Sequence, residues 1–255
     1  MITPTNENVD LNPSQQDMRE LQYLYNSNEF YILENKARGL LKKYNKSIEL
    51  QNILGFALSS QRKLIDATKI FEKIIKTQPD FYFAYNNMGN VLKDLCKLDE
   101  AKIYYQKCIK INPNYIEAYI GLGKIFLDLN KLDKSAAVFK QALKLKPENG
   151  ELHRRLSQVV KYEQTSSHVK DMEKIISSGD ATHNQQMHLS FALGKAYEDM
   201  KFYDKAFLHW KKGNFLKRKE IKYSTKYQAR LVKTIKENFT KNLFEKFKNY
   251  GNRDN

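Results

Sequence analysis

The sequence predicts an all-α fold: a right-handed superhelical solenoid of about six helix–turn–helix repeats with a C-terminal capping helix. Two observations predict it. A 34-residue period runs through the small, aromatic and proline residues, and the 255 residues include only ten Gly and five Pro. A period of this length is typical of repeats that each form two antiparallel helices. So few turn-forming residues argue against a many-stranded β protein.

Three central repeats, 48–81, 82–115 and 116–149, agree at six positions. Glycine at position eight lets the first helix approach its neighbour closely, and the aromatic residue at position twenty-four fills the space between them. Proline at position thirty-two ends the second helix, because it lacks an N–H donor and clashes with the preceding turn. These residues are Gly55, Gly89 and Gly123; Phe71, Tyr105 and Phe139; and Pro79, Pro113 and Pro147.

Weaker copies of the pattern extend the solenoid to residues 14–220. They cover 14–47, 150–186 and 187–220. The copy at 150–186 is degenerate, because three extra residues break the spacing. We expect its first helix to run through Leu152, Leu156, Val159 and Val160, and its second helix to be short.

The ends of the chain differ from the repeats. We expect 1–13 to be a disordered tail, and 221–250 to form one or two basic helices. Tyr227, Leu231, Ile235 and Phe239 are four residues apart, so they form an apolar stripe that would cap the last repeat. The final residues, 251–255, form a tail.

Composition limits the class of protein. Apolar residues make up 41% and charged residues 29%, which excludes a fully disordered chain. Neither a signal peptide nor a long apolar run is present, so we expect no membrane span. The two cysteines, Cys96 and Cys108, are too few for a disulfide framework. We therefore expect a cytoplasmic protein.

These residues resemble the tetratricopeptide repeat family across 14–220, most closely in the three central repeats. The runs 153–158, 188–199 and 203–207, and Gly213 with Asn214 after them, are similar to the repeat half of bacterial tetratricopeptide-containing sulfotransferases. In those proteins a sulfotransferase domain that uses the nucleotide PAPS follows the repeats. No Pro-x-x-Ser-Gly-Thr loop occurs in this sequence. The resemblance therefore implies an accessory half, with 251–255 as a truncation point and a sulfotransferase domain as a partner.

We expect no catalytic, cofactor or metal site on this chain. His183 and His188 are five residues apart, so they do not share a helix face. Cys108 occupies a position where small residues pack between helices, which favours a buried thiol over a nucleophile. Adjacent carboxylates such as Glu198 and Asp199 diverge on a helix and make poor acid–base pairs.

The first helices of the repeats are expected to line a concave groove that binds another protein or a peptide segment. Their amides would bond the backbone of an extended peptide, and their apolar side chains would form pockets. The alternative is that some of the apolar residues only pack against neighbouring helices. Glu117 stands where chaperone-binding repeats place a cation, which disfavours a chaperone partner. The candidate residues are Asn52, Phe56, Phe83, Asn86, Asn90, Lys93, Ile120, Lys124, Arg154, Gln158, Tyr162, Phe191 and Lys195.

The net charge of +15 is concentrated near the C-terminus, where 201–248 hold fifteen Lys and Arg against four Asp and Glu, or +11. One interpretation is a patch for nucleic acid, anionic lipid or an acidic partner. Others are a solvated face and a docking site for the missing catalytic half. No nucleic-acid motif accompanies the patch, which makes nucleic acid the weaker choice. Its residues are Lys211, Lys212, Lys217, Arg218, Lys219 and Lys222.

Overall fold

The computed structural model describes residues 13–220 and 225–247, and these residues form helices and no strands. The expected all-α solenoid is confirmed. The expected tails at 1–13 and 251–255 lie outside the described residues, apart from Pro13. The helices are α1 (Gln15–Asn26), α2 (Phe30–Lys43), α3 (Ile48–Ser60), α4 (Leu64–Thr77), α5 (Tyr82–Asp94), α6 (Leu98–Ile111), α7 (Ile116–Asp128), α8 (Leu132–Leu145), α9 (Gly150–Ser157), α10 (Ser167–Ser177), α11 (His183–Asp199), α12 (Tyr203–Glu220), α13 (Thr225–Asn238) and α14 (Lys241–Phe247).

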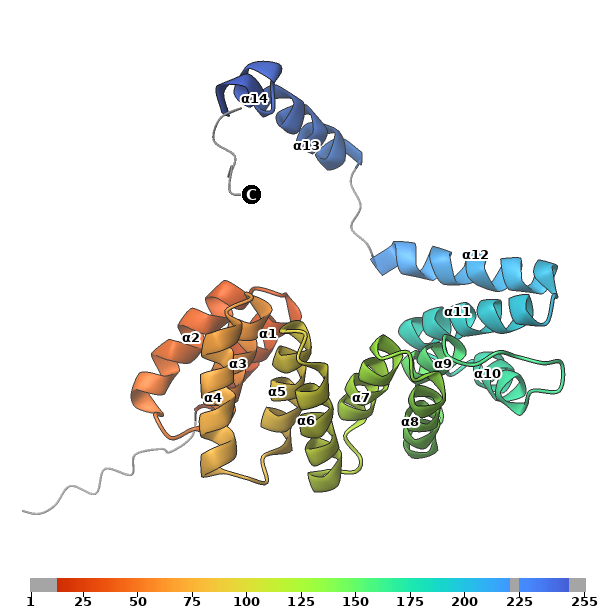
Figure 1. Cartoon of the computed structure of the whole chain (residues 1–255), viewed down its shortest axis with the longest axis horizontal. Coiled ribbons are helices and arrows are strands. Elements are labelled where there is room, and N and C mark those ends of the chain that lie inside the picture. The colour runs from red at the N-terminus through yellow and green to blue at the C-terminus, as the bar shows by residue number, and fades with distance from the viewer. Residues whose placement is uncertain (1–12, 221–224, 248–255) are drawn as a thin grey trace, which may run out of the picture.

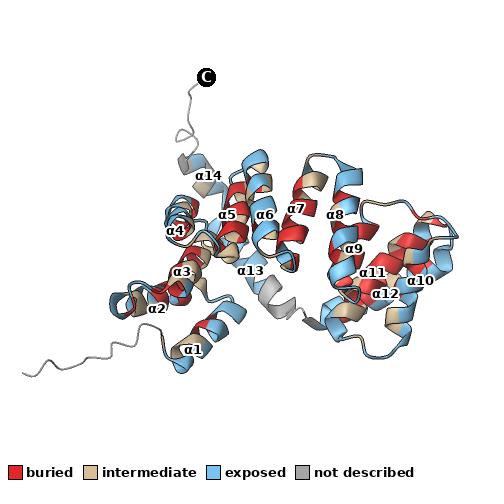
Figure 2. Ribbon diagram, turned by 90° about the horizontal axis from the view of Figure 1, so that it is seen from below, coloured by how far each residue is buried: buried red, intermediate tan, exposed pale blue. Residues whose placement is uncertain are grey.

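From the α1–α2 pair to α8 the helices follow one another along the longest axis of the molecule, and at the far end α11 packs on α9 while α12 runs back over α11 (Figure 1). From α1 to α9 each helix packs against the next, and the odd-numbered helices α3, α5 and α7 also contact one another. Buried residues lie on the faces where neighbouring helices meet (Figure 2). This arrangement places the first helices of successive repeats along one wall, which is the requirement for a groove.

A glycine in the first helix and an aromatic ring in the second pack together in each of the three central repeats. A Cβ atom at Gly55 would lie 2.6 Å from Phe71 Cε1, and one at Gly89 would lie 2.8 Å from Tyr105 Cε1. The rings of Phe71 and Tyr105 are completely buried. The two helices of a repeat can therefore pack at this distance only because position eight has no side chain.

The turns inside the repeats also recur with the 34-residue period. Asn28, Arg62, Cys96 and Asn130 each have a positive φ, between 54° and 64°. Each is followed by a residue whose N–H bonds back to the preceding helix, as Lys63 N does to Leu58 O at 3.0 Å. This pattern is the Schellman motif, which uses one left-handed residue to end a helix and reverse the chain.

The fifth repeat departs from the expected layout. Helix α9 ends at Ser157, so Val159 and Val160 lie beyond it. The second helix is short, as expected, and is α10. Helix α11 packs directly against α9 as well as against α12. Helix α9 thus ends early, and the chain needs nine more residues before α10 begins.

A chain of hydrogen bonds stabilises this irregular segment. His153 Nε2 lies 2.6 Å from the carbonyl oxygen of Pro147, so it donates, and its Nδ1 must accept. His168 Nε2, 2.7 Å from that Nδ1, is then the donor. The hydroxyl of Tyr162 donates to His168 Nδ1 at 2.7 Å. Every ring nitrogen is used when both histidines are neutral.

This arrangement corrects the assignment of Tyr162 to the groove. Its side chain is only 3% exposed and packs in the core formed by α10, α11 and α12. The physical reason is the early end of α9, which removes Tyr162 from the helix that would have carried it to the wall.

The helix expected to cap the last repeat is present as α13, but its apolar stripe is not covered. Leu231, Ile235 and Phe239 are 42%, 47% and 58% exposed. The side chain of Tyr227 lies outside the described residues. A cap must bury its apolar face against the last repeat, so the capping role is wrong for these three residues. Among the described helices none is long and apolar enough to cross a bilayer.

We expect Gly55→Ala to destabilise the protein by about 1–3 kcal/mol, because the new methyl group would overlap the buried ring of Phe71. Gly39→Ala is the matched control in α2, where a Cβ meets nothing within 4 Å. It should stabilise by about 0.5–1 kcal/mol through helix propensity. Denaturant unfolding of both variants measures the difference. Equal effects would contradict the close-packing argument.

Stability is expected to fall between about pH 6.5 and about pH 4. Burial and the neighbouring His153 lower the pKa of His168 from 6.5 to about 4. Burial also lowers the pKa of His153, although Asp171 and Glu148 oppose this. The unfolded chain therefore binds more protons in this window, and folding loses about 2–3 kcal/mol as the pH falls through it.

The variant His168→Gln tests this pH dependence. Its amide can accept from Tyr162 and donate to His153, but it does not titrate. Unfolding free energies measured at pH 7.5 and pH 5 should differ less in the variant than in the wild type. An unchanged difference would show that another group causes the loss.

Candidate functional site

A groove on the first helices of the repeats encloses a cavity of about 520 Å³. It is lined by α1, α3, α5, α7 and the start of α9, with no contribution from the even-numbered helices. Eight of the thirteen candidate residues meet here: Asn52, Phe56, Phe83, Asn86, Asn90, Lys93, Ile120 and Lys124.

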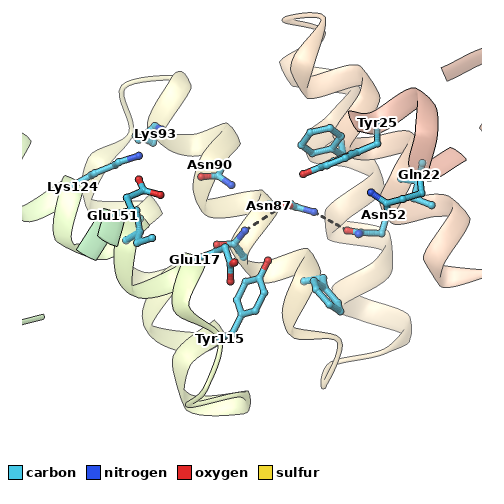
Figure 3. A pocket seen from close by; sticks show the side chains of 16 residues that line it. Gln22, Tyr25, Asn52, Asn87, Asn90, Lys93, Tyr115, Glu117, Lys124 and Glu151 are labelled. Carbon is cyan, nitrogen blue, oxygen red and sulfur yellow. Dashed lines mark hydrogen bonds between the residues drawn. The ribbon is translucent and has the colours of Figure 1, made fainter. Parts of the chain in front are cut away.

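Side-chain amides form the middle of the groove. Asn87 Nδ2 donates to Asn52 Oδ1 at 2.9 Å, and Asn86 Nδ2 lies 3.4 Å from Asn87 Oδ1 (Figure 3). The hydroxyl of Tyr105 donates to Asn90 Oδ1 at 2.7 Å. That bond fixes the amide of Asn90 and leaves its N–H donors for another acceptor. Within the described residues, the buried Asn86 Oδ1 has no hydrogen-bond donor.

Aromatic rings border the amides on two sides. Phe56 packs between Tyr25 and Phe30, with ring centroids 4.7 and 5.8 Å away. Phe83 packs against Tyr82 and Tyr115, at 4.2 and 5.4 Å. Both phenylalanines are half-buried. Both rings therefore pack against neighbouring side chains and also line the cavity. Packing against neighbouring helices and forming pockets in the groove are thus compatible for these two residues.

One end of the groove carries two lysines, of which Lys93 lies 3.8 Å from a carboxylate oxygen of Asp94. Lys93 and Lys124 lie there with Glu151, far from Gln22 and Tyr25 at the other end (Figure 3). Burial lowers the pKa of Lys124, and the charges of Arg155 and Lys93 lower it further. A lowered pKa means that the nearby carboxylates do not fully offset the cost of burying the positive charge of Lys124. A bound anionic group would offset the rest of that cost.

The structure separates four other candidate residues from this groove. Arg154, Gln158, Phe191 and Lys195 line a second cavity of about 320 Å³, together with Ser157 and Trp210. The guanidinium of Arg154 lies over the ring of Phe191, 4.7 Å from its centroid. Lys195 forms an ion pair with Asp199, whose other oxygen accepts from Tyr162 N at 3.2 Å. These cations already have partners inside the protein.

Sequence reasoning missed several residues of the main groove. Asn87 follows Asn86 directly, and Tyr115 precedes α7, so neither is among the residues that the repeat pattern predicts for the groove. Tyr25 and Gln22 come from the weakly matching first repeat. Glu117 also lines the groove, whereas its position in the sequence indicates only that a chaperone partner is disfavoured. The signal for Asn87 was present, because it lies one helical turn from Asn90 on the same face.

The basic patch lies on α12. Lys211, Lys212, Lys217, Arg218 and Lys219 are all exposed, whereas Lys222 lies outside the described residues. Two large apolar side chains, Phe207 and Phe215, stand among them and are 63% and 59% exposed. The patch is remote in sequence from the groove, and it carries no titratable pair suited to acid–base chemistry.

Metal ligation and thiol chemistry have no support among the described residues. No group of three or more His, Cys, Asp or Glu side chains there could hold a metal ion. Cys108 is completely buried, and burial raises the pKa of its thiol to about 12. A thiol with so high a pKa is not a nucleophile at neutral pH.

Comparison with known proteins agrees with the fold. Residues 82–115 and 116–149 each match a family model for the tetratricopeptide repeat. No curated protein matches the chain in sequence. Among solved structures, the thermophilic TPR protein TTC0263 of Thermus thermophilus is 16% identical with a TM-score of 0.57, over 70% of this chain and 98% of its own. A crystal structure of MamA is 20% identical with a TM-score of 0.50, over 67% and 98%.

At these identities the solved structures establish the fold alone. The family models, in contrast, match on sequence, over two of the three repeats that agree most closely with one another. Residues 82–149 are therefore two tetratricopeptide repeats, and the described helices share the fold of a solved tetratricopeptide repeat protein.

Proposed function

We propose that this protein is a scaffold whose groove binds an extended segment of another polypeptide. The observation that carries the proposal is the row of asparagine amides between aromatic walls. An extended peptide presents N–H and C=O groups at regular intervals, and its side chains alternate in direction. Side-chain amides can form hydrogen bonds with the backbone N–H and C=O groups, and half-buried rings can contact the side chains of the peptide.

Asn90 is the best-defined contact for a peptide backbone. Its Oδ1 is occupied by the Tyr105 hydroxyl at 2.7 Å, so its amide is already oriented. Less side-chain freedom is then lost on binding, which favours affinity. The buried Oδ1 of Asn86 has no donor among the described residues, so a peptide N–H that reached it would satisfy it. The incompletely compensated ammonium group of Lys124 favours an acidic residue in the bound segment.

Alanine substitution at Asn90 tests the proposal. Peptides would first be selected on the wild-type protein from a random peptide display library. We expect Asn90→Ala to weaken their binding by about two- to tenfold, which corresponds to one lost hydrogen bond of about 0.5–1.5 kcal/mol. Dissociation constants from fluorescence anisotropy would measure the effect.

Two controls separate this contact from general damage. Tyr105→Phe removes the hydroxyl that bonds Asn90 and keeps the amide, so it isolates the loss of orientation. Asn45→Ala changes an exposed asparagine outside the groove and should have no effect. Equal binding by the wild type and Asn90→Ala, for every selected peptide, would contradict a role for this amide in binding.

The accessory half of a sulfotransferase is a second proposal, and it rests on the sequence resemblance of residues 153–158 and 188–207 alone. In that case the polypeptide bound in the groove would be a substrate of the catalytic domain. Nothing in the groove favours it over a scaffold, because a binding surface for a protein would look the same in both. The scaffold is therefore the function we propose.

A further inference from the structure

Two helices at the C-terminal end expose large apolar side chains together with many cations. On α13, Leu231, Val232 and Ile235 are 42%, 49% and 47% exposed. They lie on one side of the helix, because Leu231 and Ile235 are one turn apart and Val232 is three residues before Ile235. Exposure of these apolar side chains to water is unfavourable, so the stripe is suited to contact with an apolar partner.

The cations of α13 lie around and opposite this stripe. Lys236 follows Val232 by one turn and so borders the stripe, while Lys233 lies on the far side. Arg230, Lys233 and Lys236 are all exposed. Lys233 Nζ lies 3.7 Å from a carboxylate oxygen of Glu237, and Glu237 is the only acidic residue in this helix. The helix is therefore amphipathic and basic.

Helix α12 has the same combination on its exposed side. Tyr203, Phe207, Leu208 and Phe215 are between 59% and 65% exposed. The ammonium group of Lys219 lies over the ring of Phe215, 4.5 Å from its centroid. Aromatic rings with long basic side chains beside them are suited to an interface that is apolar below and anionic above.

We propose that α12 and α13 bind the surface of a membrane that contains anionic phospholipid. The apolar stripe of α13 and the exposed rings of α12 enter the boundary between headgroups and acyl chains. Cations that border the apolar side chains, such as Lys236, contact lipid phosphates, and cations farther from the stripe, such as Lys233, add attraction at longer range. Charge complementarity and the exposed apolar area both contribute, and neither alone gives stable attachment.

Two other partners fit these helices less well. Nucleic acid would use the cations, but aliphatic side chains such as Leu231, Val232 and Ile235 gain nothing from phosphates and do not stack on bases. A second copy of this chain would bring two strongly basic surfaces together, and like charges oppose such contact. Only an anionic and apolar partner uses every exposed group.

The test is sedimentation of the full chain with lipid vesicles. The probes are vesicles of phosphatidylcholine mixed with phosphatidylglycerol, and vesicles of phosphatidylcholine alone. The wild type should sediment with the mixed vesicles and not with the neutral ones. Raising the salt concentration should weaken binding, because it screens the attraction between lysines and lipid phosphates.

Paired variants separate the apolar and the electrostatic contributions. Leu231→Ser with Ile235→Ser removes the stripe, and Lys233→Gln with Lys236→Gln removes two charges. Each pair should weaken vesicle binding by about tenfold. The matched controls change exposed residues of the same types elsewhere: Ile65→Ser with Ile103→Ser, and Lys107→Gln with Lys110→Gln. These should bind as the wild type does.

Four results would overturn the proposal. The first is no sedimentation with the mixed vesicles, and the second is full binding by the serine pair. The third is binding to a short DNA duplex that depends on the lysines and not on Leu231 and Ile235, which would assign the surface to nucleic acid. Light scattering in the absence of lipid measures whether the chain forms a dimer. A dimer that is lost in the Leu231→Ser, Ile235→Ser variant, together with no binding of the wild type to vesicles, would assign the surface to a second copy.

Discussion

The contact between a glycine in the first helix of a repeat and a buried ring in the second determines the geometry of this solenoid. At Gly55 and Gly89 there is no room for even one methyl group beside Phe71 and Tyr105. This contact sets the distance between paired helices. Because successive pairs then stack in the same way, the first helices align on one wall. The groove is a consequence of that alignment.

One ring links this packing directly to the groove. Tyr105 fills the space beside Gly89, and its hydroxyl also holds Asn90 at 2.7 Å. The same side chain thus spaces two helices and orients an amide on the wall. Phe71 and Phe139 lack the hydroxyl, so the repeats on either side of this one have no equivalent bond. The middle of the groove therefore contains an amide that is already oriented, which favours a backbone contact there.

The fifth repeat divides the molecule into two unlike parts. Before it, one core runs from α1 to α7, and the groove lies along it. Within it, the early end of α9 turns Tyr162 inward and brings His153 and His168 together. After it, α12 and α13 expose apolar and basic side chains. The proposed peptide groove and the proposed membrane surface thus belong to different parts of the chain.

The sequence by itself determined the fold, because each central repeat has a glycine, an aromatic residue and a proline at the same three positions, and these set its two helices and the end of the second. It also indicated eight groove residues, since the first helices must form the wall if the repeats stack. Only the tertiary structure decided where this regularity ends. The position of Tyr162 depended on a helix that stops at Ser157, and the exposure of Leu231 and Ile235 depended on whether α13 meets the last repeat. Asn87 and Tyr115 joined the groove through the packing of adjacent helices, which no single repeat encodes.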